Sequence, residues 1–448
     1  MNSIDLNTLF RIDALAIIMM ALVAFIAVTV LSFSARYMKG DRHEKRFFIT
    51  MAAMAIMVMV MVAANHFVLL LACWVLANVL LVSLMIHKWS WPQAVASGRL
   101  AAFNFTLGAI CIGAGMIMIS TATGQTTVSG IVNQAQTDSP MLTFALVLII
   151  LGAMTQSAIW PFHRWLTSSL NAPTPVSAIM HAGLVNSGGF LLARFAPLYL
   201  QSPDLLTFIF VVGIATALLG TLWKLIQPDI KRMLACSTMG QMGFMMAQCG
   251  LGLFPAAVAH LCWHGLFKAY LFLGSGSAAQ EKRMDPGYPP SARAFSLALI
   301  CGAIGGAIFS AITIKIGHGL DTTLLLSALA CIAGTQFALP FFRDKTWGAL
   351  PLAALFTGGM GALYGLSVQT IALIMAPMNI LQPQPLNGFH LAGFGLLIFA
   401  WLAMLFGRTW ISQAAKQGWF QKLYVQSLNA GQPHPSTITA HRNHYQTL

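Results

Sequence analysis

The sequence predicts an all-α protein: a polytopic bundle of about thirteen transmembrane helices, some of them broken. Three observations predict this fold class. The 448 residues are 58% hydrophobic and only 8% charged. Apolar runs of about 20 residues, the length that crosses a bilayer as a helix, recur along the whole chain. Lys and Arg gather in every second loop between these runs, as they do in membrane proteins of fixed orientation.

The composition comes first, because it excludes a soluble protein. A soluble domain has about 25% charged residues, whereas this chain has a mean hydropathy of +0.76. We expect no cleavable signal peptide, since Met1–Leu9 lacks a basic segment and the first apolar run is long enough to span. The seven cysteines lie in apolar runs without a CxxC pair, so neither disulfides nor an iron–sulfur site is expected. The net charge of +13 lies in short loops, which argues against nucleic-acid binding.

The apolar runs define the predicted spans. They cover residues 12–33, 47–64, 67–87, 100–119, 141–161, 174–195, 205–226, 233–250, 255–279, 295–314, 322–340, 347–380 and 389–407. The run 347–380 is too long for one simple helix. Because it contains Gly358, Gly359, Gly361 and Pro377, we expect a break or a short re-entrant piece there.

The loops predict the orientation. Basic residues follow the first span and then every second span, whereas residues 120–140 contain none. By the positive-inside rule, the C-terminus is expected in the cytoplasm and the N-terminus outside. Residues 1–408 would then form the transmembrane domain, and residues 409–448 a polar, amphipathic cytoplasmic tail. This tail could lie on the membrane surface, dock a partner or be disordered.

The ionisable residues inside the spans are mostly basic. Asp13 is the one acidic residue that falls within a span, near its outer end, so a cation cage of carboxylates is not expected. His260, His264 and Lys268 follow one another at intervals of four residues and share one helix face over about 12 Å. Histidine titrates near neutral pH, and a lysine withdrawn from water releases its proton more readily. The row therefore predicts a proton path, the alternative being a stripe that only binds neighbouring helices.

Two further segments place polar residues beside spans. Pro228–Arg232 joins the seventh and eighth spans, and its proline indicates an interrupted helix, which a membrane tolerates only beside protein or water. We assign a functional role to Lys231 and a loop role to Arg232. In the other segment, Pro173 and Pro175 suit a helix start and place His181 about one and a half turns inside the span.

Residues 152–195 and 229–278 carry a family resemblance. Their segments NAPTPVSAIMHAGLVNSGG and HLCWHGLFKAYLFLGSGSA resemble the proton-translocating antiporter-like subunits of respiratory complex I and Mrp antiporters. Weaker similarity in FRIDALAIIMM and FSARYM extends the resemblance over roughly residues 10–280, with 150–280 as its core. It implies an antiporter-like fold with broken helices. It also implies that Lys231, His260, His264 and Lys268 are buried relay residues and that His181 is the family's intramembrane histidine.

The chain departs from that family in its first channel. The family has a glutamate after a tryptophan and a lysine before Ser-Ala-Gln; here Val75 follows Trp74, and Gln156 occupies the lysine position. The family's GFxSK segment is also absent after residue 285. An intact complex I subunit is therefore not expected.

One branch of the family accommodates these departures. The segments HAGLVNSGGFLL and LYVQSLNAG resemble the membrane subunits of DAB-type inorganic carbon transporters. In those systems a large zinc-bearing, carbonic-anhydrase-like soluble subunit, DabA, accompanies the membrane subunit. The resemblance implies that proton flow through this chain, in a bacterial inner membrane, drives hydration of CO2 to bicarbonate in a partner at the cytoplasmic face. The alternatives are a proton/sodium antiporter, a NADH-quinone oxidoreductase membrane subunit and a non-conducting membrane anchor.

The expected division of roles follows. The chain itself has no constellation of Cys, His and Asp for zinc, so we expect no cofactor, no metal and no catalytic site in it. Lys231 and Lys268 would hold and release protons, with His260 and His264 bridging them through water. The remaining roles fall to Asp229, which would modulate Lys231, and to Lys224 and His181, which would connect toward the other half of the path.

Overall fold

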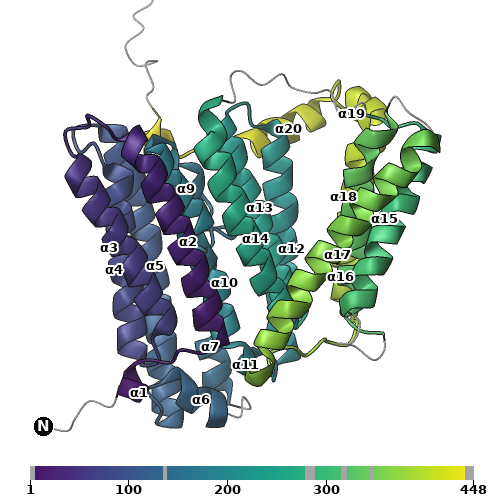
Figure 1. Ribbon diagram of the computed structural model, residues 1–448. Helices are drawn as coiled ribbons and strands as arrows, with labels where there is room; N and C mark the ends of the chain where they lie inside the picture. Colours follow the sequence, from purple (N-terminus) through teal and green to yellow (C-terminus); the bar gives the residue numbers. More distant parts are fainter. Residues whose placement is uncertain (1–5, 135–138, 278–287, 314–319, 344–346, 439–448) are drawn as a thin grey trace, which may run out of the picture.

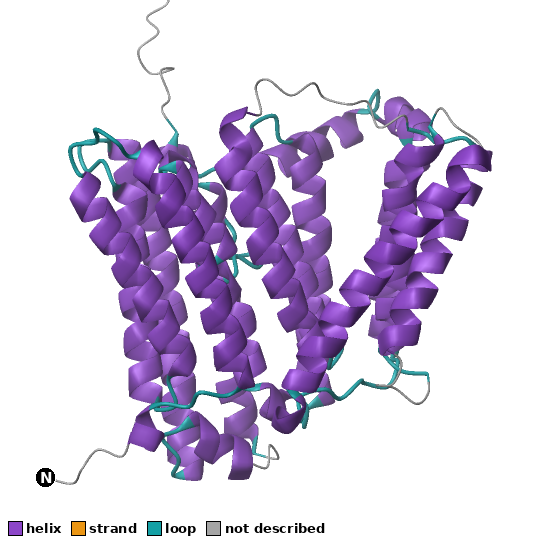
Figure 2. Ribbon diagram, in the orientation of Figure 1, coloured by secondary structure: helices purple, strands orange, loops and turns teal. Residues whose placement is uncertain are grey.

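Helices make up the regular structure of the chain. The computed structural model describes residues 6–134, 139–277, 288–313, 320–343 and 347–438. In Figure 1, α2 to α14 form one body, and α15 to α18 stand beside it with α17 leaning against α14. Figure 2 shows most loops at the two ends of the helices, with short loop segments also within the bundle. This arrangement confirms the predicted all-α transmembrane fold.

The α-helices of the described residues are α1 (Leu6–Leu9), α2 (Ala14–Tyr37), α3 (Glu44–Ala63), α4 (Phe67–Ile86), α5 (Pro92–Thr123), α6 (Val128–Gln134), α7 (Pro140–Gln156), α8 (Arg164–Thr167), α9 (Thr174–Ala182), α10 (Ser187–Arg194), α11 (Ala196–Tyr199), α12 (Pro203–Ile226), α13 (Ile230–Gly250), α14 (Phe254–Leu273), α15 (Ala292–Thr313), α16 (Thr323–Ala338), α17 (Leu350–Ile374), α18 (Gly388–Phe406), α19 (Arg408–Ala414) and α20 (Gly418–Ala430). Short 3-10 turns include η1 (Ser169–Asn171), η2 (Leu184–Asn186), η5 (Leu339–Phe342), η6 (Trp347–Ala349), η7 (Ala376–Met378) and η8 (Pro435–Thr437).

Each of the thirteen predicted spans contains a long helix, or a broken pair of helices, in the structure. Within the described residues, eleven of these segments are long and apolar enough to cross a membrane. Of the other two, α7 is apolar but shorter, and α13 has the length but a more polar composition. The count of thirteen spans therefore stays a prediction.

The helix break is at Gly183, between α9 and α10, where η2 interrupts the span 174–194. A Cβ on Gly183 would lie 2.8 Å from the Ile179 carbonyl oxygen, so a larger residue would crowd the break. At Pro228 the expectation of an interrupted helix is wrong. Here α12 ends and α13 begins as a separate antiparallel helix, because Asp229 caps α13 by accepting a hydrogen bond from the Arg232 backbone N–H at 2.9 Å.

The expected break in the run 347–380 lies at its Pro377 end, where α17 ends at Ile374 and the turn η7 contains Pro377. At Gly358–Gly361, by contrast, α17 is continuous. The physical reason is packing: Gly361 lies directly against the backbone of Gly305 in α15, where a side chain would not fit. Small residues that let helices approach closely are typical of membrane bundles. The chain leaves the helical path only after α17, where Asn379 adopts a left-handed conformation with φ 51°.

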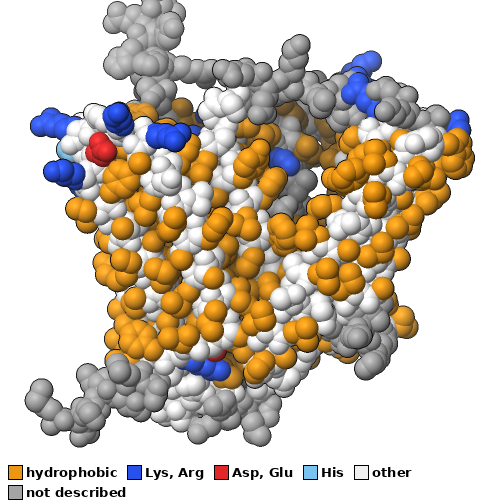
Figure 3. Space-filling view, viewed as in Figure 1, with side chains coloured by type: hydrophobic (Ala, Val, Ile, Leu, Met, Phe, Trp, Pro, Cys, Tyr) orange, Lys and Arg blue, Asp and Glu red, His pale blue; other side chains and the backbone are white. Residues whose placement is uncertain are grey.

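The two ends of the bundle differ in charge. Figure 3 shows Lys and Arg concentrated at the end where α12 meets α13, hereafter the Lys231 end. At the opposite end, hereafter the Asp13 end, α2, α12, α16 and α18 begin. This asymmetry matches the alternation of basic loops in the sequence.

The C-terminal segment lies against the Lys231 end of the same chain. Residues 431–437, hereafter the strap, follow α20 and contact the loop between α7 and α9. Four hydrogen bonds hold the strap and the end of α20: His163 Nε2 with Ala430 O at 3.3 Å, Arg232 Nη1 to Gln432 Oε1 at 2.8 Å, His434 N to Ser168 Oγ at 2.8 Å and Asn171 Nδ2 to Thr437 O at 2.9 Å. Residues 430–437 therefore pack against the bundle.

His163 makes this strap contact sensitive to pH. Its ring packs against Trp223 with 4.7 Å between centroids, and its burial lowers the pKa of the imidazole below the usual value. Because the folded protein disfavours the charged ring, this contact is stable where His163 is neutral. It weakens as the pH falls through the lowered pKa.

Candidate proton-relay site

The row predicted on α14 is buried inside the bundle. His260 is 9% exposed, His264 5% and Lys268 0%. The two imidazole rings are nearly parallel, with centroids 6.0 Å apart. Within the part of the chain that the structure describes, neither ring has a hydrogen-bond partner at Nε2. An unpaired polar atom in a protein interior costs free energy unless it binds water. Ring nitrogens that are free to bind water are what a water-mediated relay requires.

Lys268 and His181 converge on one turn of α13. Lys268 Nζ donates to the Leu234 carbonyl oxygen at 3.2 Å, and the Thr238 hydroxyl donates to the same oxygen at 3.0 Å. His181 Nδ1 lies 3.0 Å from Thr238 Oγ1. The His181 ring also stacks on Phe272 with 4.2 Å between centroids. Residues of α9, α13 and α14 are thus joined in one buried polar cluster.

Thr238 fixes the protonation geometry of His181. Because the hydroxyl hydrogen of Thr238 is directed at Leu234, its oxygen is available as an acceptor. Nδ1 of His181 must therefore carry the hydrogen of that bond, which leaves Nε2 as the nitrogen that accepts a proton. This assignment makes Thr238 a positioning residue, which the sequence reading did not single out.

We therefore expect Thr238→Val to lower proton flux by about tenfold, since a buried N–H that loses its acceptor costs about 1–3 kcal/mol. Proton flux in vesicles containing the purified chain measures this effect. Thr238→Ser, which restores the hydroxyl, is the matched variant and should recover most of the flux. Equal flux in the Val and Ser variants would contradict the positioning role.

Lys231 lies beside this cluster, on the side of the Lys231 end. It is half-buried in the first turn of α13, one turn before Leu234, and its Nζ donates to the Ala172 carbonyl oxygen at 3.3 Å. Ala172 follows Asn171, which hydrogen-bonds the strap. Two hydrogen bonds at neighbouring residues, Asn171 and Ala172, thus link the strap and Lys231 to the same loop.

Two predicted residues lie apart from the cluster. Asp229 is exposed and caps α13, and the structure gives it no ion pair with Lys231 among the described residues. Lys224 is exposed on α12, close enough to Lys268 for electrostatic repulsion but without a hydrogen bond to the described part of the chain. Neither residue is placed to pass a proton directly to His181.

The other half of the expected path is occupied by a neutral pair. Asn78 of α4 and Gln156 of α7 exchange two hydrogen bonds at 3.1 and 3.0 Å, and both side chains are buried. Val75, by contrast, is 41% exposed on another face of α4. The residue that faces Gln156 is therefore Asn78, one turn after Trp74. Sequence reading could have found it from the spacing of four residues.

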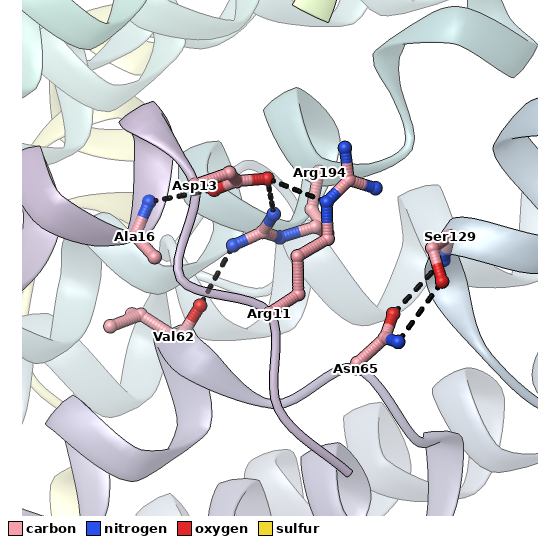
Figure 4. A network of polar contacts seen from close by, with 7 residues as sticks. All are labelled: Arg11, Asp13, Ala16, Val62, Asn65, Ser129 and Arg194. Atoms are coloured by element: carbon pink, nitrogen blue, oxygen red, sulfur yellow. Dashed lines mark hydrogen bonds and ion pairs between the residues drawn. The ribbon is translucent and has the colours of Figure 1, made fainter. Parts of the chain in front are cut away.

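A buried ion pair at the Asp13 end was also missed. Figure 4 shows Arg194 of α10 and Arg11 both directed at the Asp13 carboxylate. Arg194 Nη1 donates to Asp13 at 2.5 Å, Arg194 Nη2 donates to the Val62 carbonyl oxygen at 2.8 Å, and Arg11 Nε lies 3.1 Å from Asp13. Asp13 also caps α2 by accepting from the Ala16 backbone N–H at 3.0 Å. The network joins α2, α3 and α10, far along the helices from Lys231.

No cluster of three or more His, Cys, Asp or Glu residues suited to a metal occurs within the residues that the structure describes. What the arrangement offers chemically is a column of titratable groups, with Lys231 and Lys268 toward one end and His264 and His260 below them. Protons can move along such a column by exchange between side chains and intervening water.

Sequence comparison places these features in a family. Residues 64–295 match the family described as NADH:quinone oxidoreductase/Mrp antiporter, TM. Residues 1–48 match the family described as NADH-Ubiquinone oxidoreductase (complex I), chain 5 N-terminus. Together the two matches include every residue of the buried relay cluster.

Individual curated relatives show to which part of this family the chain is most similar. The "Probable inorganic carbon transporter subunit DabB1" of Halothiobacillus neapolitanus is 40% identical over 285 residues, which cover 62% of this chain and 51% of that protein. The "Probable inorganic carbon transporter subunit DabB" of Bacillus subtilis is 31% identical over 445 residues, which cover 96% and 85%. The chloroplastic NAD(P)H-quinone oxidoreductase subunit 5 of Brachypodium distachyon is 35% identical over 310 residues, covering 67% and 42%. The chain thus spans about half the length of the first of these relatives.

A solved structure supports the fold. A chain in the structure of the Mrp complex from Dietzia sp. DQ12-45-1b matches with a TM-score of 0.65 at 23% sequence identity, over 94% of this chain and 52% of that one. This likeness shows the fold. The sequence matches show that the chain belongs to the NADH:quinone oxidoreductase/Mrp antiporter family of membrane subunits, and within it to the DabB inorganic carbon transporter subunits.

Proposed function

We propose that this chain is a proton-conducting membrane subunit that couples the proton motive force to inorganic carbon uptake by a carbonic-anhydrase-like partner subunit. The observation that carries the proposal is the buried row of Lys268, His264 and His260, joined through Leu234 and Thr238 to His181. The similarity to proteins named as inorganic carbon transporter subunits supplies the substrate class.

The proposed orientation puts the Lys231 end in the cytoplasm of a bacterial inner membrane, because that end carries most of the basic residues. The C-terminal tail then lies in the cytoplasm and the N-terminus outside. A DabA-like partner would dock at the cytoplasmic face and carry the zinc. This division suits a chain that has a buried basic row and, within its described residues, no cluster of His, Cys, Asp or Glu suited to a metal.

The alternative function is that of a proton/sodium antiporter or a NADH-quinone oxidoreductase membrane subunit. It is favoured by the similarity to the chloroplastic NAD(P)H-quinone oxidoreductase subunit 5. The neutral Asn78–Gln156 pair argues against it, because two amides in place of an ion pair cannot take up or release a proton. A membrane anchor without conduction is a third reading, in which the basic row only holds helices together.

The test is uptake of labelled inorganic carbon by a carbonic-anhydrase-deficient bacterial host that expresses the chain together with a DabA-like soluble protein. We expect uptake and growth in air, and we expect uptake to stop within minutes of adding a protonophore. The control is the same host with the soluble protein alone. Uptake that persists after the protonophore would contradict coupling, and sodium-dependent proton flux in vesicles would favour the antiporter.

A further inference from the structure

The strap joins the two elements that meet at Lys231. On one side, Asn171 Nδ2 in the loop before α9 donates to the Thr437 carbonyl oxygen of the strap at 2.9 Å. On the other side, Arg232 Nη1 in the first turn of α13 donates to Gln432 Oε1 of the strap at 2.8 Å. The strap therefore ties this loop to the start of α13, although the strap lies some 200 residues later in the chain than Arg232.

The hydrogen bond of Lys231 crosses between the same two elements. Its Nζ donates to the Ala172 carbonyl oxygen at 3.3 Å. Asn171 immediately precedes Ala172, and Arg232 immediately follows Lys231. Each contact of the strap thus lies one residue away from the donor or the acceptor of the Lys231 bond. A movement that separates the loop from α13 would break the strap contacts and the Lys231 contact together.

The strap is also packed against the helices around it. Gly431, Pro433 and Thr437 are buried. A Cβ on Gly431 would lie 2.9 Å from Gln227 Nε2 and 3.1 Å from Trp223 Cβ, so the backbone of the strap lies directly against the end of α12. The turn η8 packs against α5. Because the strap is supported by α5 and α12 as well as by its hydrogen bonds, it can hold the loop and α13 in fixed positions.

Lys231 needs such a support, because its position does not favour an inward ammonium. It lies in the first turn of α13, where the exposed backbone N–H groups give the helix end a partial positive charge that repels a cation. A lysine near a helix end also tends to extend its ammonium into water. Without the Ala172 contact we expect the side chain to turn outward, away from Lys268, whose Nζ is bound to Leu234 one turn further along α13.

We propose that the strap is a positioning element of the proton path: it clamps the loop before α9 to the start of α13 and so keeps the Lys231 ammonium on the Ala172 carbonyl oxygen. The key residue of the strap is Gln432, since its bond with Arg232 is the one hydrogen bond between the strap and α13 in the part of the chain that the structure describes. The inference rests on the proposed proton conduction and adds to it that the C-terminal tail sets the position of one relay lysine.

The clamp can be tested without any measurement of proton flux. Lysines of the purified chain in detergent are labelled with a water-soluble acylating reagent, and the label on each is followed by mass spectrometry. Gln432→Leu keeps the side-chain size and removes the acceptor for Arg232. We expect Lys231 to react about fivefold faster in this variant, because the loss of one hydrogen bond of ordinary strength shifts a population by about that factor. Exposed Lys88 is the internal reference.

Two matched variants complete the labelling test. Gln426→Leu removes an exposed glutamine of α20 in the same tail, and Lys231 should react in it as in the unmodified chain. Gln432→Glu keeps an acceptor for Arg232, so it should protect Lys231 as well as glutamine does. Equal labelling of Lys231 in Gln432→Leu and Gln426→Leu overturns the inference.

Proton flux in vesicles then separates the positioning of Lys231 from a general structural role. We expect Gln432→Leu to lower the flux about fivefold, in line with the loss of one hydrogen bond, and Gln432→Glu to conduct like the unmodified chain. In a chain that carries Lys231→Met, Gln432→Leu should make no further difference, because the ammonium that the strap positions is gone.

The flux results have distinct meanings. A fall in flux on Gln432→Leu that is the same with and without Lys231→Met overturns the inference, since the strap would then act on the whole fold. An unmodified chain that conducts no protons above empty vesicles overturns the proposed function instead, and the labelling of Lys231 still decides whether the strap holds this side chain in place.

Discussion

Lys268→Met is expected to lower proton flux about 100-fold, within the range that a single positioned acid–base group contributes to a proton transfer. Lys268 is fully buried, and its Nζ donates to the Leu234 carbonyl oxygen that Thr238 also binds. Methionine has a similar length and no charge, so the cost of burying an ammonium disappears and the fold should be retained. Flux driven by an imposed pH gradient in vesicles containing the purified chain measures the effect.

Lys268→Arg sharpens this test. Arginine keeps the positive charge but does not release its proton in a protein, so we expect it to fail as a relay residue as well. Lys422→Met is the control, since Lys422 is exposed on α20 and should leave the flux unchanged. Conduction by Lys268→Met within twofold of the unmodified chain would mean that the basic row is only structural.

Asp13→Ala is expected to destabilise the folded chain by about 3–5 kcal/mol, the usual cost of leaving one partner of a buried ion pair uncompensated. Arg194 is 2% exposed and loses its Asp13 partner in this variant, and α2 loses its N-terminal cap. Arg11 is more exposed and can turn to solvent, so the cost arises chiefly from Arg194. Chemical unfolding in detergent micelles gives the free energy difference.

The double variant Asp13→Ala/Arg194→Leu should recover much of this loss, because no buried charge remains unpaired. Asp204→Ala is the control for removing a carboxylate: Asp204 is exposed in the first turn of α12. Its effect should stay within about 0.5 kcal/mol. A single Asp13→Ala variant as stable as Asp204→Ala would show that the Asp13–Arg194 pair does not hold α2 and α10 together.

The positions of the helices could be predicted from the sequence because each one buries its own backbone polar groups and is long enough to span a membrane. The interiors of the helices were harder to predict. At Gly358–Gly361 the glycines suggested a break, yet Gly361 serves close packing against Gly305. At Pro228 the proline marks a connection between two helices. A glycine or proline signals an unusual backbone or a close approach, and the sequence alone does not distinguish them.

The candidate site was predictable in part for a similar reason. The spacing of His260, His264 and Lys268 places them on one face of a single helix, which follows from helical geometry alone. The contact of Lys231 with Ala172 crosses 59 residues of sequence, and the pair Asn78–Gln156 crosses 78. Such contacts depend on how separate helices pack. For this reason the sequence pointed to Val75, whereas the residue that faces Gln156 in the structure is Asn78.

By itself, then, the sequence determined that this chain is a bundle of apolar helices with a row of basic groups on α14, because hydrophobicity, length and a period of 3.6 residues are local properties. Only the tertiary structure decided which partners the buried groups have: Lys268 and Thr238 share the Leu234 carbonyl, and Arg194 is neutralised by Asp13. Hydrogen bonds and ion pairs need partners within about 3 Å. In this protein those partners come from helices far apart in the sequence.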